Sequence, residues 1–146
     1  MLRAEIQDAL GDDALAIEHV GSTSVPGLLA KPILDICLTV QDPAAEGRYV
    51  PTLGTAGYEL RIREPAWHEH RMLWHAHPSS HLHVFPAGCA EVGRMVRFRD
   101  RLRSDPTSLE RYARAKQELA SRHWCDGQDY ADAKSTIIEE ILAGTV

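Results

Sequence analysis

The stretch EHVGSTSVPGLLAKPILD, residues 18–35, is the strongest indication of fold class in this sequence. It joins a Gly-Ser turn with two further hydroxyl residues to a Pro-Gly turn, and then to an apolar, strand-like run that carries Asp35. The residues of the first turn are Gly21, Ser22, Thr23 and Ser24. Such a turn exposes backbone N–H groups and hydroxyls together, which suits phosphate oxygens. The segment therefore predicts a phosphate-binding turn beside a strand with one carboxylate.

The run ILDICLTV after Pro32 has the β-branched and apolar character of a central strand. Because strand side chains alternate, Asp35 shares one face with Cys37, whereas Ile36 and Leu38 lie on the face that packs on helices. Asp35 then points to an open, polar face, where a carboxylate and substrate phosphates together hold a hard cation such as Mg²⁺. The alternative is that the hydroxyls only cap a helix and that backbone N–H groups satisfy Asp35.

Outward from this stretch, hydrophobic periodicity predicts an α+β domain with a mixed sheet. Asp42 and Pro43 predict a helix that starts at Asp42 and stops near Pro51 or Gly54. The other expected elements are a helix over 2–10, strands over 14–20, 58–64, 70–77 and 80–86, and three helices after Ala90. With no repeat and no linker, residues 1–146 are expected to form a single domain with helices on one face of the sheet.

Composition excludes several classes of protein. No apolar run approaches the roughly 20 residues of a membrane span, and the first ten residues fit an amphipathic helix rather than a signal peptide. Three widely spaced cysteines favour a reducing, cytoplasmic setting over a disulfide framework. The net charge of -5 makes nucleic acid an unfavourable partner, but a basic region over 94–122 suits a small anionic ligand.

Six of the eight histidines fall within sixteen residues and form three H-x-H pairs: His68 and His70, His75 and His77, His81 and His83. Within a strand, each pair places both imidazoles on one face, and two pairs on adjacent strands suit Zn²⁺ or a similar metal. The alternative for the first two pairs is that they lie on exposed strand ends or loops.

The stretch HVGSTSVPGLLAKPILDI, residues 19–36, resembles the signature of the GrpB family, whose members have a nucleotidyltransferase-like fold. The resemblance continues in HLHVFPAG, FRDRLRSDP, RYARAKQELA and YADAKSTIIEEIL, and it covers nearly the whole chain after Ala16. The segment that usually precedes this signature is expected to be shorter here.

The resemblance implies a Gly-Ser turn for a triphosphate at Gly21 and Ser22, and a first metal-binding aspartate at Asp35. Cys37 stands where a second aspartate is usual, and a thiol is a poor ligand for Mg²⁺. If the fold sets the 80–86 strand beside the Asp35 strand, His83 lies where a third carboxylate would be. Asp35, His81 and His83, with Cys37, would then form a mixed metal site that suits Zn²⁺ or Mn²⁺. A role of these histidines in phosphate binding, or a structural role, stays open.

Basic residues complete the expected site. Lys31 is positioned to reach the Gly-Ser turn. Lys134 falls on an apolar helix stripe, from which its amine either reaches a phosphate in the cleft or forms a structural ion pair. Arg99 either pairs with a carboxylate or reaches a phosphate. Lys116 recurs at a family-like position.

The sequence therefore predicts a protein that binds a nucleotide or another phosphorylated small molecule with a divalent metal, with Mg²⁺ favoured by the fold. The leading function is nucleotidyl transfer to a small acceptor, with Asp35 on the metal and His83 as base or third ligand. The alternatives are a non-catalytic binding module and a histidine-dependent metalloenzyme.

Overall fold

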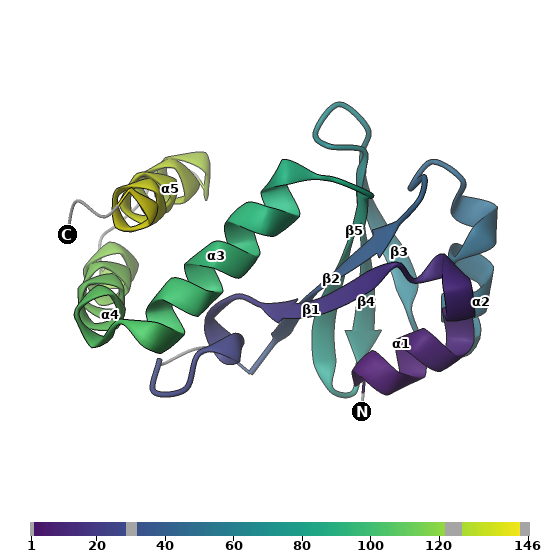
Figure 1. Ribbon diagram of the computed structural model, residues 1–146, viewed down its shortest axis with the longest axis horizontal. Helices are drawn as coiled ribbons and strands as arrows, with labels where there is room; N and C mark the ends of the chain where they lie inside the picture. The colour runs from purple at the N-terminus through teal and green to yellow at the C-terminus, as the bar shows by residue number, and fades with distance from the viewer. Residues whose placement is uncertain (1, 29–31, 122–126, 144–146) are drawn as a thin grey trace.

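The computed structural model describes residues 2–28, 32–121 and 127–143, which form an α+β fold (Figure 1). The helices are α1 (Leu2–Leu10), α2 (Val50–Thr55), α3 (Ala90–Ser104), α4 (Pro106–Ser121) and α5 (Gly127–Leu142). The strands are β1 (Ala16–Val20), β2 (Leu34–Val40), β3 (Glu59–Glu64), β4 (His70–Ala76) and β5 (Ser79–Pro86). A short 3₁₀ turn, η2 (Ser22–Ser24), follows β1. The α+β class and the expected order of strands are confirmed.

The strands form one mixed sheet in the order β1-β2-β5-β4-β3. Only the central pair, β2 and β5, is parallel, and the other neighbours are antiparallel. The parallel register places His81 beside Asp35 and His83 beside Cys37. The strand that carries the last H-x-H pair is therefore the direct neighbour of the Asp35 strand, as predicted.

The two faces of the sheet are covered differently. Ile36 and Leu38 belong to the main core, which also contains Ile6 of α1 and Leu53 of α2. On the opposite face, the buried Cys37 packs with Val20 and Phe85 against residues of α3 that include Val92, Met95 and Val96. Helices were expected on one face only. This second face is instead partly covered by α3, because its apolar side chains also require burial.

The segment after Asp42 departs from the expected helix. The Asp42 carboxylate accepts a hydrogen bond from the Ala44 N–H at 3.0 Å and so caps a turn. The hydroxyl of the buried Tyr49 donates to the Pro43 carbonyl at 2.5 Å, which fixes this turn against the core. The α-helix begins only at Val50.

Figure 1 shows α1 and α2 at one side of the sheet and α3, α4 and α5 gathered at the other. None of the helices within the described ranges is long and apolar enough to cross a membrane.

Candidate functional site

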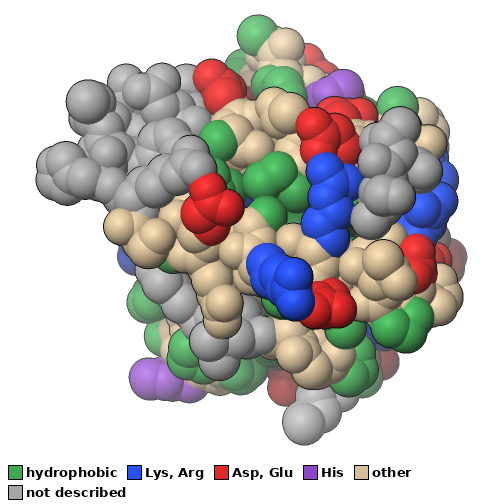
Figure 2. Space-filling model, turned by 90° about the vertical axis from the view of Figure 1, so that its left-hand side faces the viewer, with side chains coloured by type: hydrophobic (Ala, Val, Ile, Leu, Met, Phe, Trp, Pro, Cys, Tyr) green, Lys and Arg blue, Asp and Glu red, His purple; other side chains and the backbone are tan. Residues whose placement is uncertain are grey.

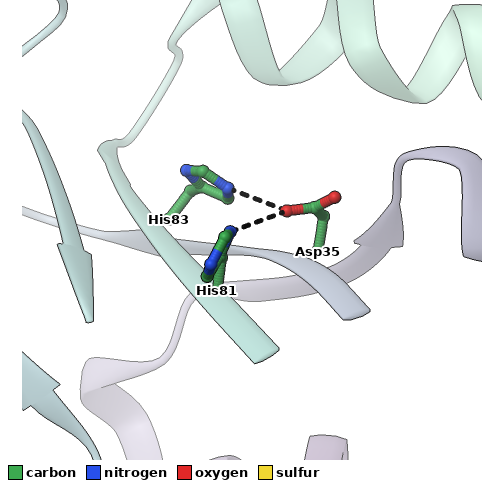
Figure 3. Close-up of side chains that lie close together, drawn as sticks. All are labelled: Asp35, His81 and His83. Carbon is green, nitrogen blue, oxygen red and sulfur yellow. Dashed lines mark hydrogen bonds and ion pairs between the residues drawn. The ribbon is translucent and has the colours of Figure 1, made fainter. Parts of the chain in front are cut away.

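Asp35 and the last two histidines form the centre of the candidate site (Figure 3). His83 Nε2 lies 3.3 Å and His81 Nδ1 lies 3.7 Å from the same oxygen, Asp35 Oδ1. One donor atom from each of the three residues lies within 4.8 Å of the other two. The parallel register produces this arrangement, because β2 and β5 present the three side chains on one face of the sheet.

The three donors fit a divalent transition metal. A tetrahedral ion with ligands about 2.1 Å away holds those ligands about 3.4 Å apart, close to both separations found here. Two imidazole nitrogens and one carboxylate oxygen suit Zn²⁺, Mn²⁺ or Fe²⁺ better than Mg²⁺, which prefers oxygen ligands. The donor set therefore favours a borderline metal over the Mg²⁺ that the fold resemblance implies.

The Gly-Ser turn lies directly against Asp35. Gly21 follows Val20, which pairs with Asp35 across β1 and β2. Ser22 Oγ accepts a hydrogen bond of 2.6 Å from Lys116 Nζ of α4. Ser24 is different, because its buried hydroxyl donates to the Gly21 carbonyl at 2.5 Å and closes the turn. Thr23 Oγ1 lies 2.9 Å from His19 Nε2.

Lys134 of α5 supplies a second cation to the same cleft. Burial lowers the pKa of its ammonium, and the nearby Asp35 carboxylate acts in the opposite direction. Burial and the charge of Lys134 likewise lower the pKa of Lys116, and Asp35 again opposes this. Among the described residues, the Lys134 ammonium has no hydrogen-bond or ion-pair partner. A half-buried cation of this kind is suited to an anionic ligand.

Cys37 lies outside the group of metal donors. Its side chain is 1% exposed, and its Sγ donates to Met95 Sδ of α3 at 3.7 Å. Burial raises the pKa of the thiol to about 12, so the thiolate that binds metals is strongly disfavoured. The expected placement of Cys37 among the ligands is not what the structure shows, because α3 covers this end of the sheet.

Arg99 lines the cleft, but its guanidinium is held by protein groups. It donates to Glu18 at 2.7 Å, to the His19 carbonyl at 3.1 Å and to Asp100 at 2.9 Å. Of the two roles left open by the sequence, the geometry favours pairing with carboxylates. Lys31 lies outside the described residues.

Two residues outside the set Asp35, Cys37, His81 and His83 extend the site: His70, from the first H-x-H pair, and Glu64, which the sequence did not mark. His70 Nε2 lies 3.0 Å from His83 Nδ1, and His70 Nδ1 lies 2.7 Å from Glu64 Oε1. His70 is 4% exposed, so the expectation of an exposed strand end is wrong for this residue. The H-x-H pattern was the available signal, but only the register of β4 and β5, in which Met72 pairs with His83, brings the His70 side chain next to that of His83.

The cleft has a volume of about 800 Å³ and is lined by both polar and apolar side chains. The polar lining includes Ser22, Asp35, His81, His83 and the two lysines. The apolar lining comes mainly from α3, α4 and α5 and includes Phe98, Leu102, Tyr112 and Ile138, which belong to one hydrophobic cluster. Figure 2, which views the end of the molecule formed by α4 and α5, shows hydrophobic side chains in the middle of this face, with charged ones beside them.

Three comparisons place the chain among known proteins. A UPF0157 protein of Halalkalibacterium halodurans is 54% identical over 94% of this chain and 70% of its own. A UPF0157 protein of Streptomyces coelicolor is 46% identical over 93% of this chain and 71% of its own. The crystal structure of the conserved protein GrpB from Enterococcus faecalis superposes with a TM-score of 0.78 at 28% identity, over 99% of this chain and 90% of that one.

A weaker similarity connects the fold to a cytoplasmic RNA terminal U-transferase, with a TM-score of 0.42 and 14% identity over 80% of this chain and 39% of that one. A similarity at this level says nothing about activity. The family model described as "GrpB protein" matches residues 1–144. The chain therefore belongs to the GrpB family.

Proposed function

We propose that this protein binds the phosphate groups of a nucleotide, or of another phosphorylated small molecule, beside a divalent metal held by Asp35, His81 and His83. The observation that carries the proposal is the shared cleft: the cationic Lys116 and Lys134 lie with the three metal donors around one cavity. Cationic donors and metal ions both stabilise phosphate oxygens that are taken out of water.

The roles of the residues follow from their positions. Lys116, Lys134 and Ser22 bind phosphate oxygens, and the apolar side chains that line the cleft pack against the uncharged part of the ligand. Asp35, His81 and His83 would hold the divalent metal, which would act as a Lewis acid and offset negative charge on the phosphate oxygens. We assign His83 to metal binding rather than to proton abstraction, because its second nitrogen already contacts His70.

The reaction that fits this arrangement is nucleotidyl transfer. An acceptor oxygen forms a bond to the α-phosphorus, the bond to the bridging oxygen breaks, and pyrophosphate leaves with the electron pair while the acceptor proton passes to solvent. The burial of Cys37 beside Met95 favours a second candidate, a non-catalytic binding module, since it removes the expected second ligand.

Thermal-shift and calorimetric titrations with nucleotides and with Mn²⁺, Zn²⁺ and Mg²⁺ test the proposal. A ligand at 100 times its Kd stabilises the fold by about 2.7 kcal/mol, which is readily measured. We expect metal-dependent nucleotide binding in the wild type and its loss in Asp35→Asn. The matched control is Asp8→Asn, which removes an exposed carboxylate of α1 far from the cleft.

Pyrophosphate release in the presence of a small acceptor supports transfer, whereas binding without release supports the binding module. If neither metals nor nucleotides bind, both candidates are wrong. A metal that binds without any phosphorylated ligand supports a histidine-dependent metalloenzyme instead.

A further inference from the structure

Four side chains form a continuous row from the exposed edge of β3 to the cleft. Glu64 Oε1 lies 2.7 Å from His70 Nδ1, His70 Nε2 lies 3.0 Å from His83 Nδ1, and His83 Nε2 lies 3.3 Å from Asp35 Oδ1. The sheet builds this row, because Glu64 pairs with His70 across β3 and β4, and His83 pairs with the next residue on that face of β4, Met72.

The row has three close contacts but only two N–H protons to form hydrogen bonds in them when both imidazoles are neutral. Three close contacts join two carboxylates through two imidazoles, and each contact needs one N–H to be a hydrogen bond. Two neutral imidazoles carry only two N–H groups between them. One of the three contacts therefore lacks a proton and brings two lone pairs together unless a cation lies between them.

The distances indicate which contact lacks the proton. The two shortest, Glu64 to His70 and His70 to His83, are lengths of good hydrogen bonds. For both contacts to be hydrogen bonds, His70 must carry its proton on Nδ1, and His83 must carry its proton on Nδ1 as well. His83 Nε2 then presents a lone pair to Asp35 across the longest contact, 3.3 Å.

We propose that Glu64 and His70 are positioning residues that hold His83 in the Nδ1–H tautomer, with its Nε2 lone pair directed at Asp35 and the cleft. The use of this lone pair as a metal ligand rests on the proposed function. Carboxylates commonly fix metal-binding histidines in this way, and loss of such a partner typically lowers metal affinity 10- to 100-fold.

The surroundings of His70 hold it in place for this role. Its ring stacks on that of His83 with an interplanar angle of 22°, and it packs against Phe85 at a centroid distance of 4.9 Å. Trp67 covers it edge-on at 5.0 Å. Aromatic rings thus hold the imidazole on several sides.

The first experiment uses the metal-free protein and does not depend on the proposed function. The ¹⁵N chemical shifts of the ring nitrogens report which nitrogen of each histidine carries the proton. At a pH where both rings are neutral, we expect the Nδ1–H form for His70 and His83. An Nε2–H form of His83 in the wild type overturns the proposal.

The second experiment measures Zn²⁺ affinity in two variants of the same residue. His70→Phe keeps the packing on Phe85 and Trp67 but removes the acceptor, so we expect a 10- to 100-fold loss of affinity. His70→Gln supplies an acceptor oxygen for the His83 N–H, so it should recover most of that loss. The control is His75→Gln, on the opposite face of the same strand.

The outcomes separate this inference from the proposed function. If the wild type binds no metal but His83 has the Nδ1–H form, the metal proposal fails and the positioning role stands. If the wild type binds Zn²⁺ and His70→Phe binds it equally well, the positioning role fails and the metal proposal stands. Circular dichroism of each variant identifies a loss of affinity that arises from unfolding.

Discussion

A Cβ atom added at Gly21 would lie 2.7 Å from Oδ2 of Asp35, closer than such contacts occur in proteins. Gly21 also has φ +76° and ψ −176°, a region of backbone conformation that is essentially restricted to glycine. The first residue of the Gly-Ser turn is therefore required both for the turn itself and for the approach of the turn to the carboxylate.

Gly21→Ala should displace the Asp35 carboxylate and abolish metal-dependent nucleotide binding. It should also lower the free energy of unfolding by about 1–3 kcal/mol, the usual cost of such backbone strain. Urea denaturation and calorimetry measure the two effects. Gly88→Ala is the control, because Gly88 has φ +74° with no atom near an added Cβ, so it should lose stability and keep binding. Equal binding by both variants would show that the close approach to Asp35 is unimportant.

Arg99→Gln should destabilise the protein without lowering its affinity for phosphate. The Arg99 side chain is 11% exposed and pairs with Glu18, so its removal should cost about 1.5–3 kcal/mol, typical of hydrogen bonds to charged groups. The exposed Arg97 lies on the same helix, and Arg97→Gln should change stability by less than about 0.5 kcal/mol. A loss of phosphate affinity in Arg99→Gln at unchanged stability would instead show that Arg99 binds phosphate.

Much of the sheet could be predicted from the sequence, because the apolar and β-branched runs of β2 and β5 strongly favour strands over helices or loops. The alternation along β2 also predicted that Asp35 and Cys37 share a face. The alternation could not predict that α3 covers this face. The packing of Met95 on Cys37 joins residues 58 positions apart, and this contact turns an expected ligand into part of the core.

Two contacts of the site escaped prediction for the same reason, although the sequence had named His70 and Lys116. The contact of His70 with His83 depends on the register of β4 and β5, which no local pattern fixes. The bond from Lys116 to Ser22 depends on how α4 docks over the turn, 94 residues away in the chain. Asp35, His81 and His83 lie together, as strand alternation, the H-x-H pattern and the resemblance to the family signature jointly led us to expect.

Lys134→Met should stabilise the free protein and weaken its binding of phosphate. The methionine keeps the apolar stem but removes a half-buried cation that has no partner among the described residues, which should add about 1 kcal/mol to stability. Loss of a charged donor should cost about 1.5–3 kcal/mol of binding, or about tenfold or more in affinity. Arg114→Met, on the exposed side of α4, is the control for the change in net charge. A Lys134→Met variant that binds as tightly as the wild type would exclude a role in the cleft.

The stability gained by Lys134→Met should also depend on pH. Burial lowers the pKa of Lys134 below the 10.5 of a free lysine, so the folded state holds this proton more weakly than the unfolded chain does. The resulting destabilisation is fully present below the lowered pKa and disappears as the pH rises from there through 10.5. Denaturation at pH 7 and pH 10 should therefore show the advantage of the variant shrinking at the higher pH. An advantage that grows with pH would contradict this assignment.

Cys37→Asp should damage the protein rather than restore a second metal-binding carboxylate. The side chain is enclosed by Val20, Phe85 and Met95, and this environment already raises the pKa of the thiol to about 12. A carboxyl group there must either ionise without water or raise its own pKa by several units, at a cost of about 1.4 kcal/mol for each unit at pH 7. We expect a loss of about 2–4 kcal/mol relative to Cys37→Ser, which keeps the size of the side chain and carries no charge. Because the folded state favours the protonated acid, this difference should shrink as the pH falls from 7 towards 4. A stable Cys37→Asp protein with tighter Mg²⁺ binding would instead show that α3 can move away from this face and admit a second metal.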